Sequence, residues 1–265
     1  MNQTLAIANQ KGGVGKTTTC VNLAASLVSN GRRVLLVDMD PQANATVGAG
    51  IDKDAVRASN YELLMGEATA RGVRCRDGHG GFDVLPANGD LTAAEVGLMS
   101  VGEGREKRLQ SALAPCRDEY DHILIDCPPS LNLLTVNAFV AADHVLIPIQ
   151  CEYYALEGLT ALLNTIERVR QTVNPSLEIE GLVRTMFDGR NNLSNQVGAQ
   201  LLAHFPGQVY RTQIPRNVRL AEAPSHGLPV LQYDRGSRGA VAYLALASEL
   251  LRRQPRTTAE AGGLS

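Results

Sequence analysis

The sequence of 265 residues predicts an α/β fold, a doubly wound and mostly parallel sheet with helices on both faces. Short apolar runs alternate with helical patterns along the whole chain. Several runs, among them VLLVD, ILID and VLIPI, are apolar almost throughout, which is typical of strands buried on both faces of a parallel sheet. Alternation of strands and helices further implies right-handed crossover connections.

Each expected strand is a short run rich in Val, Ile and Leu, and each expected helix is a longer stretch with apolar residues on one face. The expected strands are Leu5–Asn9, Val34–Asp38, Phe82–Leu85, His122–Asp126, His144–Ile149, Gly181–Met186 and Val209–Ile214. The expected helices are Thr17–Ser29, Leu131–Ala142, Tyr153–Thr172, Leu193–His204 and Ala240–Arg253.

The chain is expected to form a single domain over residues 1–253, because no change in composition marks a boundary. The stretch Asp52–Gly104 is the least regular and contains the glycine cluster DGHGG. It predicts a helical excursion and a hairpin on the same domain. Residues 254–265 (QPRTTAEAGGLS) are polar and rich in Gly and Ala, so we expect a disordered tail.

Composition excludes several classes of protein. With 44% hydrophobic and 20% charged residues, the chain is not of the disordered, collagen-like or disulfide-scaffold type. The five cysteines are odd in number and form no C-x-x-C pair, which favours small core residues in a reducing cytosol. Neither a signal peptide nor an uninterrupted run of about 20 apolar residues is present. We therefore expect a cytoplasmic protein with no membrane partner.

The net charge of -2 hides an uneven distribution. Residues 1–180 hold 15 Lys and Arg against 22 Asp and Glu, a balance of -7. Residues 181–265 hold 10 Arg against 5 Asp and Glu, a balance of +5. A basic C-terminal third is compatible with nucleic-acid binding, although scattered arginines on a solvated face would give the same count.

The segment QKGGVGKTT, Gln10–Thr18, predicts a phosphate-binding loop between the first strand and the first helix. Glycines allow backbone N–H groups to turn toward phosphate, and the helix N-terminus adds its positive end. Lys16 supplies charge for the β- and γ-phosphates, and Thr17 offers a hydroxyl to Mg²⁺. The usual glycine five residues before Gly15 is replaced by Gln10, while Lys11 is an additional lysine. A glycine-rich turn without a ligand is the alternative. The predicted nucleotide-binding residues in this loop are Lys11, Gly12, Gly13, Val14, Gly15, Lys16, Thr17 and Thr18.

Two further strands end in aspartate. VLLV is followed by Asp38 and Asp40, and ILI is followed by Asp126. Because the carboxyl ends of the strands line the ligand crevice of an open α/β sheet, these carboxylates are candidates for Mg²⁺, directly or through water. An aspartate at such a position can instead cap a helix or stabilise a turn.

These motifs resemble the ParA/MinD group of P-loop ATPases, whose deviant Walker A loop has the form KGGVGKTT. Within this group the resemblance is to the ParA/Soj partition ATPases, and it covers nearly the whole chain. It rests on four further segments: DMDPQANAT, IDCPPSL, PIQCEYYALEGL and IPRNVRLAEAPSHGLPV.

The resemblance implies an ATPase that dimerises with ATP, two subunits enclosing two nucleotides. Lys11 would reach the partner's nucleotide as an arginine finger does, and Asp40 would orient the attacking water. The implied catalytic residues are Lys11, Lys16 and Asp40. The implied Mg²⁺ ligands are Thr17, Asp40 and Asp126. Adenine contacts are implied for Met186, Pro215 and Asn217.

The resemblance also implies that the ATP dimer binds double-stranded DNA without sequence preference and that a ParB-like centromere-binding protein stimulates a slow ATPase. Such a protein would be associated with the nucleoid and would segregate chromosomes or plasmids. Contacts to DNA phosphates are implied for Arg190, Arg216, Arg219 and Arg238.

Two alternatives within the superfamily remain open. A MinD-like membrane-surface switch would carry a basic amphipathic C-terminal helix, for which the sequence after Arg253 is unsuited. A redox ATPase similar to the nitrogenase iron protein would place two cysteines per subunit at a dimer axis. Cys127 lies beside Asp126, but no second cysteine shows a suitable motif.

Overall fold

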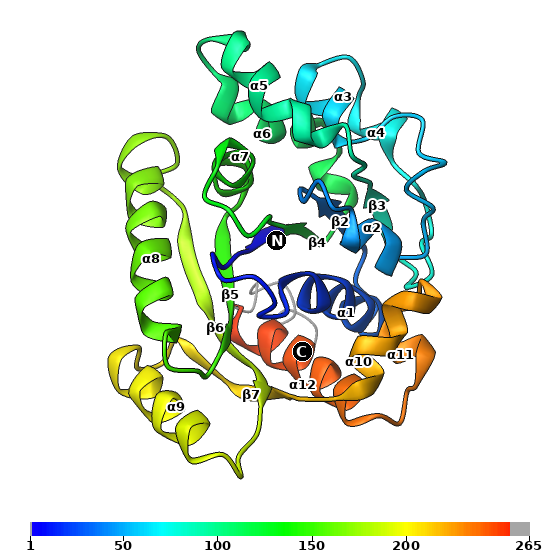
Figure 1. Ribbon diagram of the computed structural model, residues 1–265. Helices are drawn as coiled ribbons and strands as arrows, with labels where there is room; N and C mark the ends of the chain where they lie inside the picture. The colour runs from blue at the N-terminus through cyan, green and yellow to red at the C-terminus, as the bar shows by residue number, and fades with distance from the viewer. Residues whose placement is uncertain (1, 255–265) are drawn as a thin grey trace, which may run out of the picture.

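The chain folds around a seven-stranded sheet in which each pair of neighbouring strands runs parallel (Figure 1). The structure is a computed structural model that describes residues 2–254. The strand order is β3-β2-β4-β1-β5-β6-β7. The predicted α/β class is thereby confirmed. The strands are β1 (Gln3–Ile7), β2 (Val34–Asp38), β3 (Asp83–Leu85), β4 (His122–Asp126), β5 (His144–Gln150), β6 (Glu178–Phe187) and β7 (Val209–Pro215).

Helices cover both faces of the sheet (Figure 1). The long helices are α1 (Lys16–Ser29), α5 (Leu91–Val101), α7 (Leu133–Ala141), α8 (Ala155–Thr172), α9 (Asn192–His204) and α12 (Arg238–Arg253). Shorter elements are α2 (Asn44–Gly48), α3 (Asn60–Met65), α4 (Ala70–Val73), α6 (Arg108–Leu113), α10 (Val218–Glu222), α11 (Val230–Tyr233) and the 3₁₀ helices η1 (Arg105–Lys107), η2 (Ala114–Glu119) and η3 (Ala223–His226).

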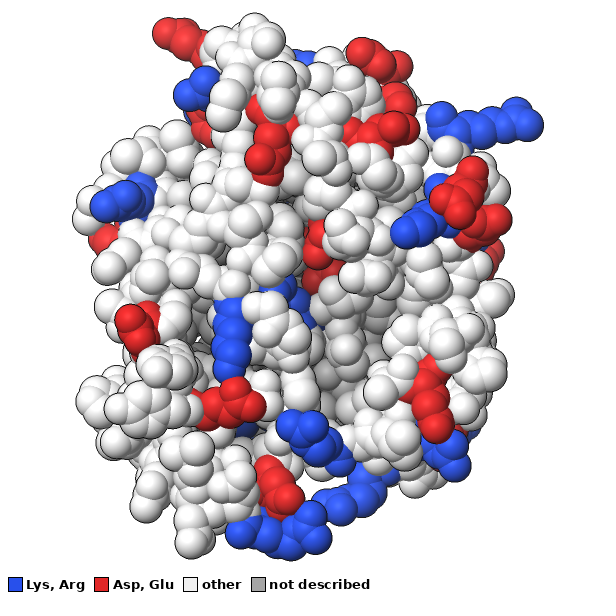
Figure 2. All heavy atoms as spheres, in the orientation of Figure 1, with Lys and Arg blue, Asp and Glu red and all other residues white. Residues whose placement is uncertain are grey.

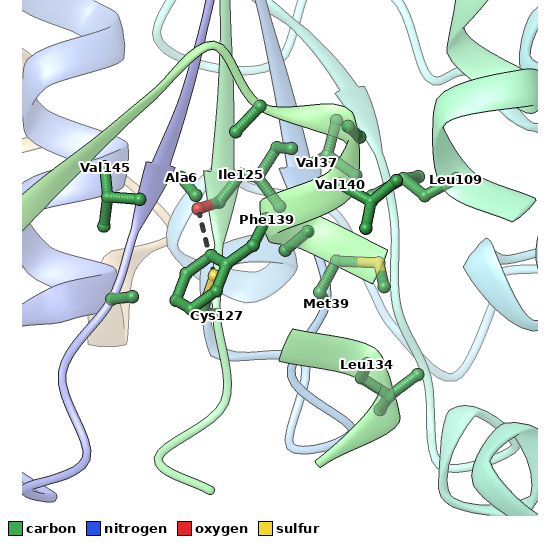
Figure 3. Packing of buried hydrophobic residues seen from close by; sticks show 14 of the residues in the cluster. Ala6, Val37, Met39, Leu109, Ile125, Cys127, Leu134, Phe139, Val140 and Val145 are labelled. Carbon is green, nitrogen blue, oxygen red and sulfur yellow. Dashed lines mark hydrogen bonds between the residues drawn. The ribbon is translucent and has the colours of Figure 1, made fainter. Parts of the chain in front are cut away.

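The two faces are filled by separate apolar clusters because side chains alternate along each strand. On β1, Leu5 and Ile7 pack with residues of α1 and α12, whereas Ala6 packs toward the opposite face. Figure 3 shows part of that second cluster, to which Phe139 of α7, Met39 and Cys127 belong. The central strands β2 and β4 are buried along their whole length and carry the apolar runs VLLV and ILI, as the sequence predicts.

Most elements begin or end one to three residues from the expected positions, and two differences from expectation have a clear physical reason. Strand β6 begins at Glu178, not Gly181, because its first residues include two glutamates that an apolar pattern overlooks. In the irregular stretch 52–104, the expected hairpin is reduced to one antiparallel bridge between Cys75 and Val84. Strand β3 instead joins the edge of the sheet parallel to β2, with Leu35 opposite Asp83.

Between residues 2 and 254, no helix combines the length and the apolar character that crossing a membrane requires. The tail predicted to be disordered lies, from residue 255 onward, outside the described residues.

Candidate nucleotide-binding site

The ends of three adjacent strands bring the predicted residues together. Register places Ile7 of β1 opposite Asp126 of β4, and Asp126 opposite Asp38 of β2. The loop between β1 and α1 therefore lies beside both aspartates at the carboxyl edge of the sheet. This is the edge at which open α/β sheets bind their ligands.

The loop after β1 has a backbone that depends on glycine. Gly13 has a φ of 74° and Gly15 a φ of 88°, a region that side chains with a Cβ rarely adopt. A Cβ added at Gly12 or Gly13 would meet no atom within 4 Å, so the space in front of these two residues is open. Gly15 begins α1 without a side-chain cap. The first N–H groups of this helix are thus left for an anion.

Lys16 lies at the first position of α1 with its side chain largely buried; the whole residue is 7% exposed. Its ammonium donates to the carbonyl oxygen of Lys11 at 3.3 Å. Burial lowers the pKa of Lys16, and the neighbouring carboxylate of Asp126 opposes this effect. A phosphate beside Lys16 would supply the counter-charge that the buried ammonium requires.

Thr17 and Asp126 form the second part of the site. The hydroxyl of Thr17 donates to Oδ2 of Asp126 at 2.7 Å, while the buried Oδ1 of Asp126 has no protein partner. Burial raises the pKa of Asp126 well above its ordinary value. A cation beside this carboxylate would reverse that shift, so the hydroxyl and the orphaned oxygen fit a Mg²⁺ ion. Within the described part of the chain, no three His, Cys, Asp or Glu side chains could hold a metal by themselves. Mg²⁺ would need phosphate oxygens and waters as further ligands, as it usually does in nucleotide sites.

Asp38 and Asp40 have different surroundings. Asp38 is fully buried, and it accepts from the backbone N–H and the hydroxyl of Thr46 at 2.8 and 2.7 Å. It therefore stabilises the start of α2. This is the structural role that the sequence left open for Asp38 as an alternative to binding Mg²⁺. Asp40 retains 8% exposure and accepts from the N–H of Gln42 at 3.0 Å. Asp40 is consequently the more exposed carboxylate of this pair.

Lys11 is turned toward the loop that follows β5. Its Nζ lies 2.5 Å from Oε2 of Glu152, whose other oxygen accepts from the side chain of Gln150 at 2.5 Å. The next two residues, Tyr153 and Tyr154, are 77% and 67% exposed. Sequence reasoning singled out the segment containing Glu152 but gave its residues no role. These residues directly follow β5, which ends at the edge of the sheet where the nucleotide site lies. This position in the sequence could have indicated a role for them.

The three predicted adenine contacts lie at the ends of β6 and β7. Thr185 donates from its hydroxyl to the carbonyl of Val14 at 2.7 Å, which joins β6 to the phosphate loop. A Cβ added at Gly15 would lie 4.0 Å from Cε of Met186, so Met186 is beside this loop. Pro215 ends β7, and Asn217 caps α10 by accepting from the N–H of Arg219 at 3.0 Å.

The predicted DNA arginines are exposed on the loop after β6 and on the segments that begin α10 and α12. Figure 2 shows basic side chains, with acidic ones among them, along the edge where α9, β7 and α12 lie in Figure 1. Arg190 is paired with Asp188 at 2.9 Å. Two other arginines of the basic C-terminal third are structural: Arg184 is 7% exposed, and Arg253 stacks 3.8 Å from the ring centre of Tyr210.

Cys127 belongs to the apolar core rather than to the crevice surface. It is 1% exposed, and its Sγ lies 3.9 Å from the carbonyl of Ile125 in the cluster around Phe139 (Figure 3). Burial raises the pKa of the Cys127 thiol. The environment is that of an inert core cysteine.

Comparison with known structures supports this fold. An ADP- and magnesium-bound structure described as cobyrinic acid a,c-diamide synthase from Mycobacterium smegmatis has a TM-score of 0.83 and 40% identity, covering 95% of both chains. The cell division ATPase MinD of Pyrococcus furiosus has a TM-score of 0.78 and 26% identity, covering 95% of this chain and 99% of that one.

Sequence comparison gives the family. Residues 2–179 match the AAA domain family. The chain is 52% identical over 259 residues to the chromosome partitioning protein ParA of Caulobacter vibrioides, covering 97% of both proteins. It is also 52% identical over 250 residues to the sporulation initiation inhibitor protein Soj of Bacillus subtilis, covering 94% of this chain and 98% of that protein. The chain therefore belongs to the ParA/Soj family of chromosome partitioning ATPases.

Proposed function

We propose that this protein is a nucleotide-switched partition ATPase that dimerises with ATP, binds DNA without sequence preference in that form, and separates DNA together with a ParB-like partner. Membership of the ParA/Soj family makes it an ATPase that acts in chromosome partitioning with ATP and Mg²⁺. The observation that carries the proposal is the arrangement of the buried Lys16 ammonium beside the hydrogen-bonded Thr17 and Asp126.

Each residue of this site has a defined task. The open backbone at Gly12–Gly15 and the uncapped start of α1 bind phosphate oxygens, and Lys16 neutralises the β- and γ-phosphates. Thr17, Asp126 and Asp40 would hold Mg²⁺, directly or through water. When bound, this ion supplies charge neutralisation on the phosphate oxygens. Asp40 orients the attacking water and accepts its proton.

Dimerisation is supported by the surface beside Lys11. Lys11 is redundant next to Lys16 within one loop, but at the partner's nucleotide it would stabilise the developing phosphate charge. The two exposed tyrosines directly after Glu152 give this rim an apolar surface that a second copy of the chain would cover.

The exposed arginines at positions 190, 216, 219 and 238 support DNA binding. Contacts to phosphates alone would be independent of sequence and strongly dependent on salt. One subunit offers few such residues, so a dimer that doubles them makes DNA binding depend on ATP. Association with the nucleoid would follow from this DNA binding.

The two alternatives have less support. The identity of 52% to partition proteins exceeds the 26% to MinD, which favours the partition role over a membrane-surface switch. The burial of Cys127 in the core of α7 and β4 argues against a cluster ligand at that position.

Size-exclusion chromatography and DNA retention, each with ATP, ADP or no nucleotide, test the proposal. We expect a dimer and retained DNA with ATP, and a monomer that releases DNA without it. Lys16→Ala is the control that weakens nucleotide binding, used at an ATP concentration that the unmodified protein needs for half-saturation. DNA retention that is the same in all three nucleotide states, or a monomer with ATP, would contradict the proposal. Addition of a ParB-like protein from the same genome should raise the rate of hydrolysis.

A further inference from the structure

The side chain of Arg219 is held between two carboxylates. Its Nη1 lies 2.8 Å from Oε2 of Glu222, and its Nε lies 3.2 Å from Oδ2 of Asp234. Oε2 of Glu222 also accepts from the hydroxyl of Tyr233 at 3.3 Å. The same guanidinium atoms would donate to a DNA phosphate. One positive charge therefore faces two negative charges.

Asp234 is connected to the phosphate loop by a short chain of hydrogen bonds. Asn22 of α1 donates to the carbonyl of Thr18 at 2.7 Å and accepts from the N–H of Val230 at 2.7 Å. Val230 begins α11, and its carbonyl accepts from the N–H of Asp234 at 2.8 Å. The position of Asp234 is thus set from the first turn of the helix that would bind phosphate.

Glu222 is connected to the segment that follows Asp40. The turn after Glu222 ends at Gly227, where an added Cβ would lie only 3.0 Å from Cα of Gly50 at the end of the α2 segment. The carbonyl of Gly227 also lies 2.8 Å from Nδ1 of His79. Helix α2 is in turn fixed to Asp38 through Thr46. A change in the segment that carries Asp38 and Asp40 would be transmitted to this turn through the close approach of the Gly227 and Gly50 backbones.

We propose that Glu222 and Asp234 are positioning residues that compete with DNA phosphate for Arg219, and that their attachment to α1 and α2 makes this competition depend on the nucleotide. The proposal rests on the proposed function, because it assigns Arg219 to DNA. In the protein without nucleotide the two carboxylates hold Arg219 as substitutes for phosphate. We call Glu222 and Asp234 together the clamp. With ATP bound, displacement of α2 or of the start of α11 moves these carboxylates away from Arg219 and frees its guanidinium.

The test compares Glu222→Gln, Asp234→Asn and the double variant with the unmodified protein. Binding to a non-specific DNA duplex is measured over a salt series, without nucleotide, with ADP and with ATP. Glu167→Gln is the matched control, since it removes a carboxylate from a similar exposed i,i+3 pair with Arg170 on α8. Exposed pairs contribute little individually, so each single variant should raise DNA affinity without nucleotide by roughly 1.4- to 5-fold.

The double variant should narrow the difference in DNA affinity between the ATP state and the state without nucleotide. It should also steepen the slope of log K against log salt by about 0.9 in the state without nucleotide, which corresponds to one additional phosphate contact. A loss of packing alone would change the melting temperature but would not steepen this slope. Affinity and slope equal to those of Glu167→Gln in every state would overturn the clamp. DNA binding by the unmodified protein with ATP distinguishes the two failures. If the unmodified protein binds DNA and the clamp variants behave like Glu167→Gln, only the clamp fails. If the unmodified protein binds no DNA with ATP, the proposed function fails as well.

Discussion

Lys11 is bound within its own chain by Glu152, with 2.5 Å between Nζ and the carboxylate oxygen. A lysine that must act at the partner's nucleotide has first to leave this carboxylate. The pair is partly exposed, with 39% and 46% of the two side chains accessible, so the barrier that it imposes is small. Glu152 thus sets how readily the lysine becomes available.

Substitution at this pair should shift dimerisation in opposite directions. Lys11→Ala is expected to remain monomeric with ATP, because the charge on the partner's phosphates is no longer compensated. Glu152→Gln should dimerise at an ATP concentration lower by roughly twofold to fivefold, because Lys11 is no longer held. Light scattering during size-exclusion chromatography measures both. A stable ATP dimer of Lys11→Ala would refute the cross-subunit role.

Asp40→Ala should bind ATP and accumulate as a DNA-bound dimer. Its rate of hydrolysis should fall by roughly 10²- to 10⁴-fold, since a positioned general base contributes about this factor. Phosphate release and DNA retention measured on the same sample test this. Asp38→Ala serves as a contrast: it removes the acceptor of two Thr46 hydrogen bonds, so its melting temperature should fall. Equal hydrolysis by Asp40→Ala and the unmodified protein would exclude Asp40 from catalysis.

Lys16→Ala should weaken nucleotide binding by roughly 10- to 100-fold, because a charge-assisted contact to phosphate is lost. The variant should remain folded, since the ammonium makes a single long contact to a carbonyl at 3.3 Å in the described chain. Isothermal titration with ATP and ADP measures the affinity, and circular dichroism checks the fold. Unchanged affinity for both nucleotides would remove Lys16 from the site.

The contribution of the buried aspartates to the stability of the nucleotide-free protein should fall as pH rises from about 4 to 7. Burial raises the pKa of Asp38 to about 6, and it also raises that of Asp126. Carboxyls with raised pKa values hold protons in the folded state that the unfolded chain has already lost, so folding is favoured at low pH and less so above pH 6. For Asp38 the change is on the order of 1 to 3 kcal/mol.

Urea unfolding between pH 4 and 8 measures this dependence, and Asp38→Asn should flatten it. Mg²⁺ with nucleotide should flatten it as well, because a cation beside Asp126 favours its ionised form. Burial lowers the pKa of His122 to about 4, which makes stability rise over the same pH range, so the test compares the unmodified protein with Asp38→Asn. A difference in unfolding free energy between these two proteins that stays constant from pH 4 to pH 7 would contradict the assignment.

Arg219→Glu should abolish DNA binding with ATP but leave ATP-dependent dimerisation intact. The matched control is Arg170→Glu, which reverses an exposed charge of the same kind on α8. Filter retention at low salt with ATP tests the variant, and light scattering confirms the dimer. Retention of DNA by Arg219→Glu at low salt would show that other residues supply the DNA contacts.

Much of the fold could be predicted from the sequence because strands buried on both faces of a parallel sheet are apolar almost throughout, as in VLLVD and ILID. The glycines and the position of Lys16–Thr17 likewise follow from the loop's chemistry. The sequence did not reveal that Asp38 would be fully engaged by Thr46, eight residues away, because this depends on how α2 folds back. It also did not reveal which arginines are structural. Arg184 is buried, whereas Arg190 is exposed and paired with Asp188, and neither burial nor pairing can be recognised from the residue type alone. The assigned roles of the site residues remain predictions until the variants are measured.

The central place of β1 in the sheet has a consequence for hydrogen exchange. This strand carries the phosphate loop and is paired on both sides, with β4 and with β5. Its amides should therefore be among the slowest to exchange with solvent and should open only with global unfolding. A bound nucleotide should slow their exchange only by the amount by which it raises the free energy of global unfolding, while exchange by local opening should respond at α2, α10 and α11.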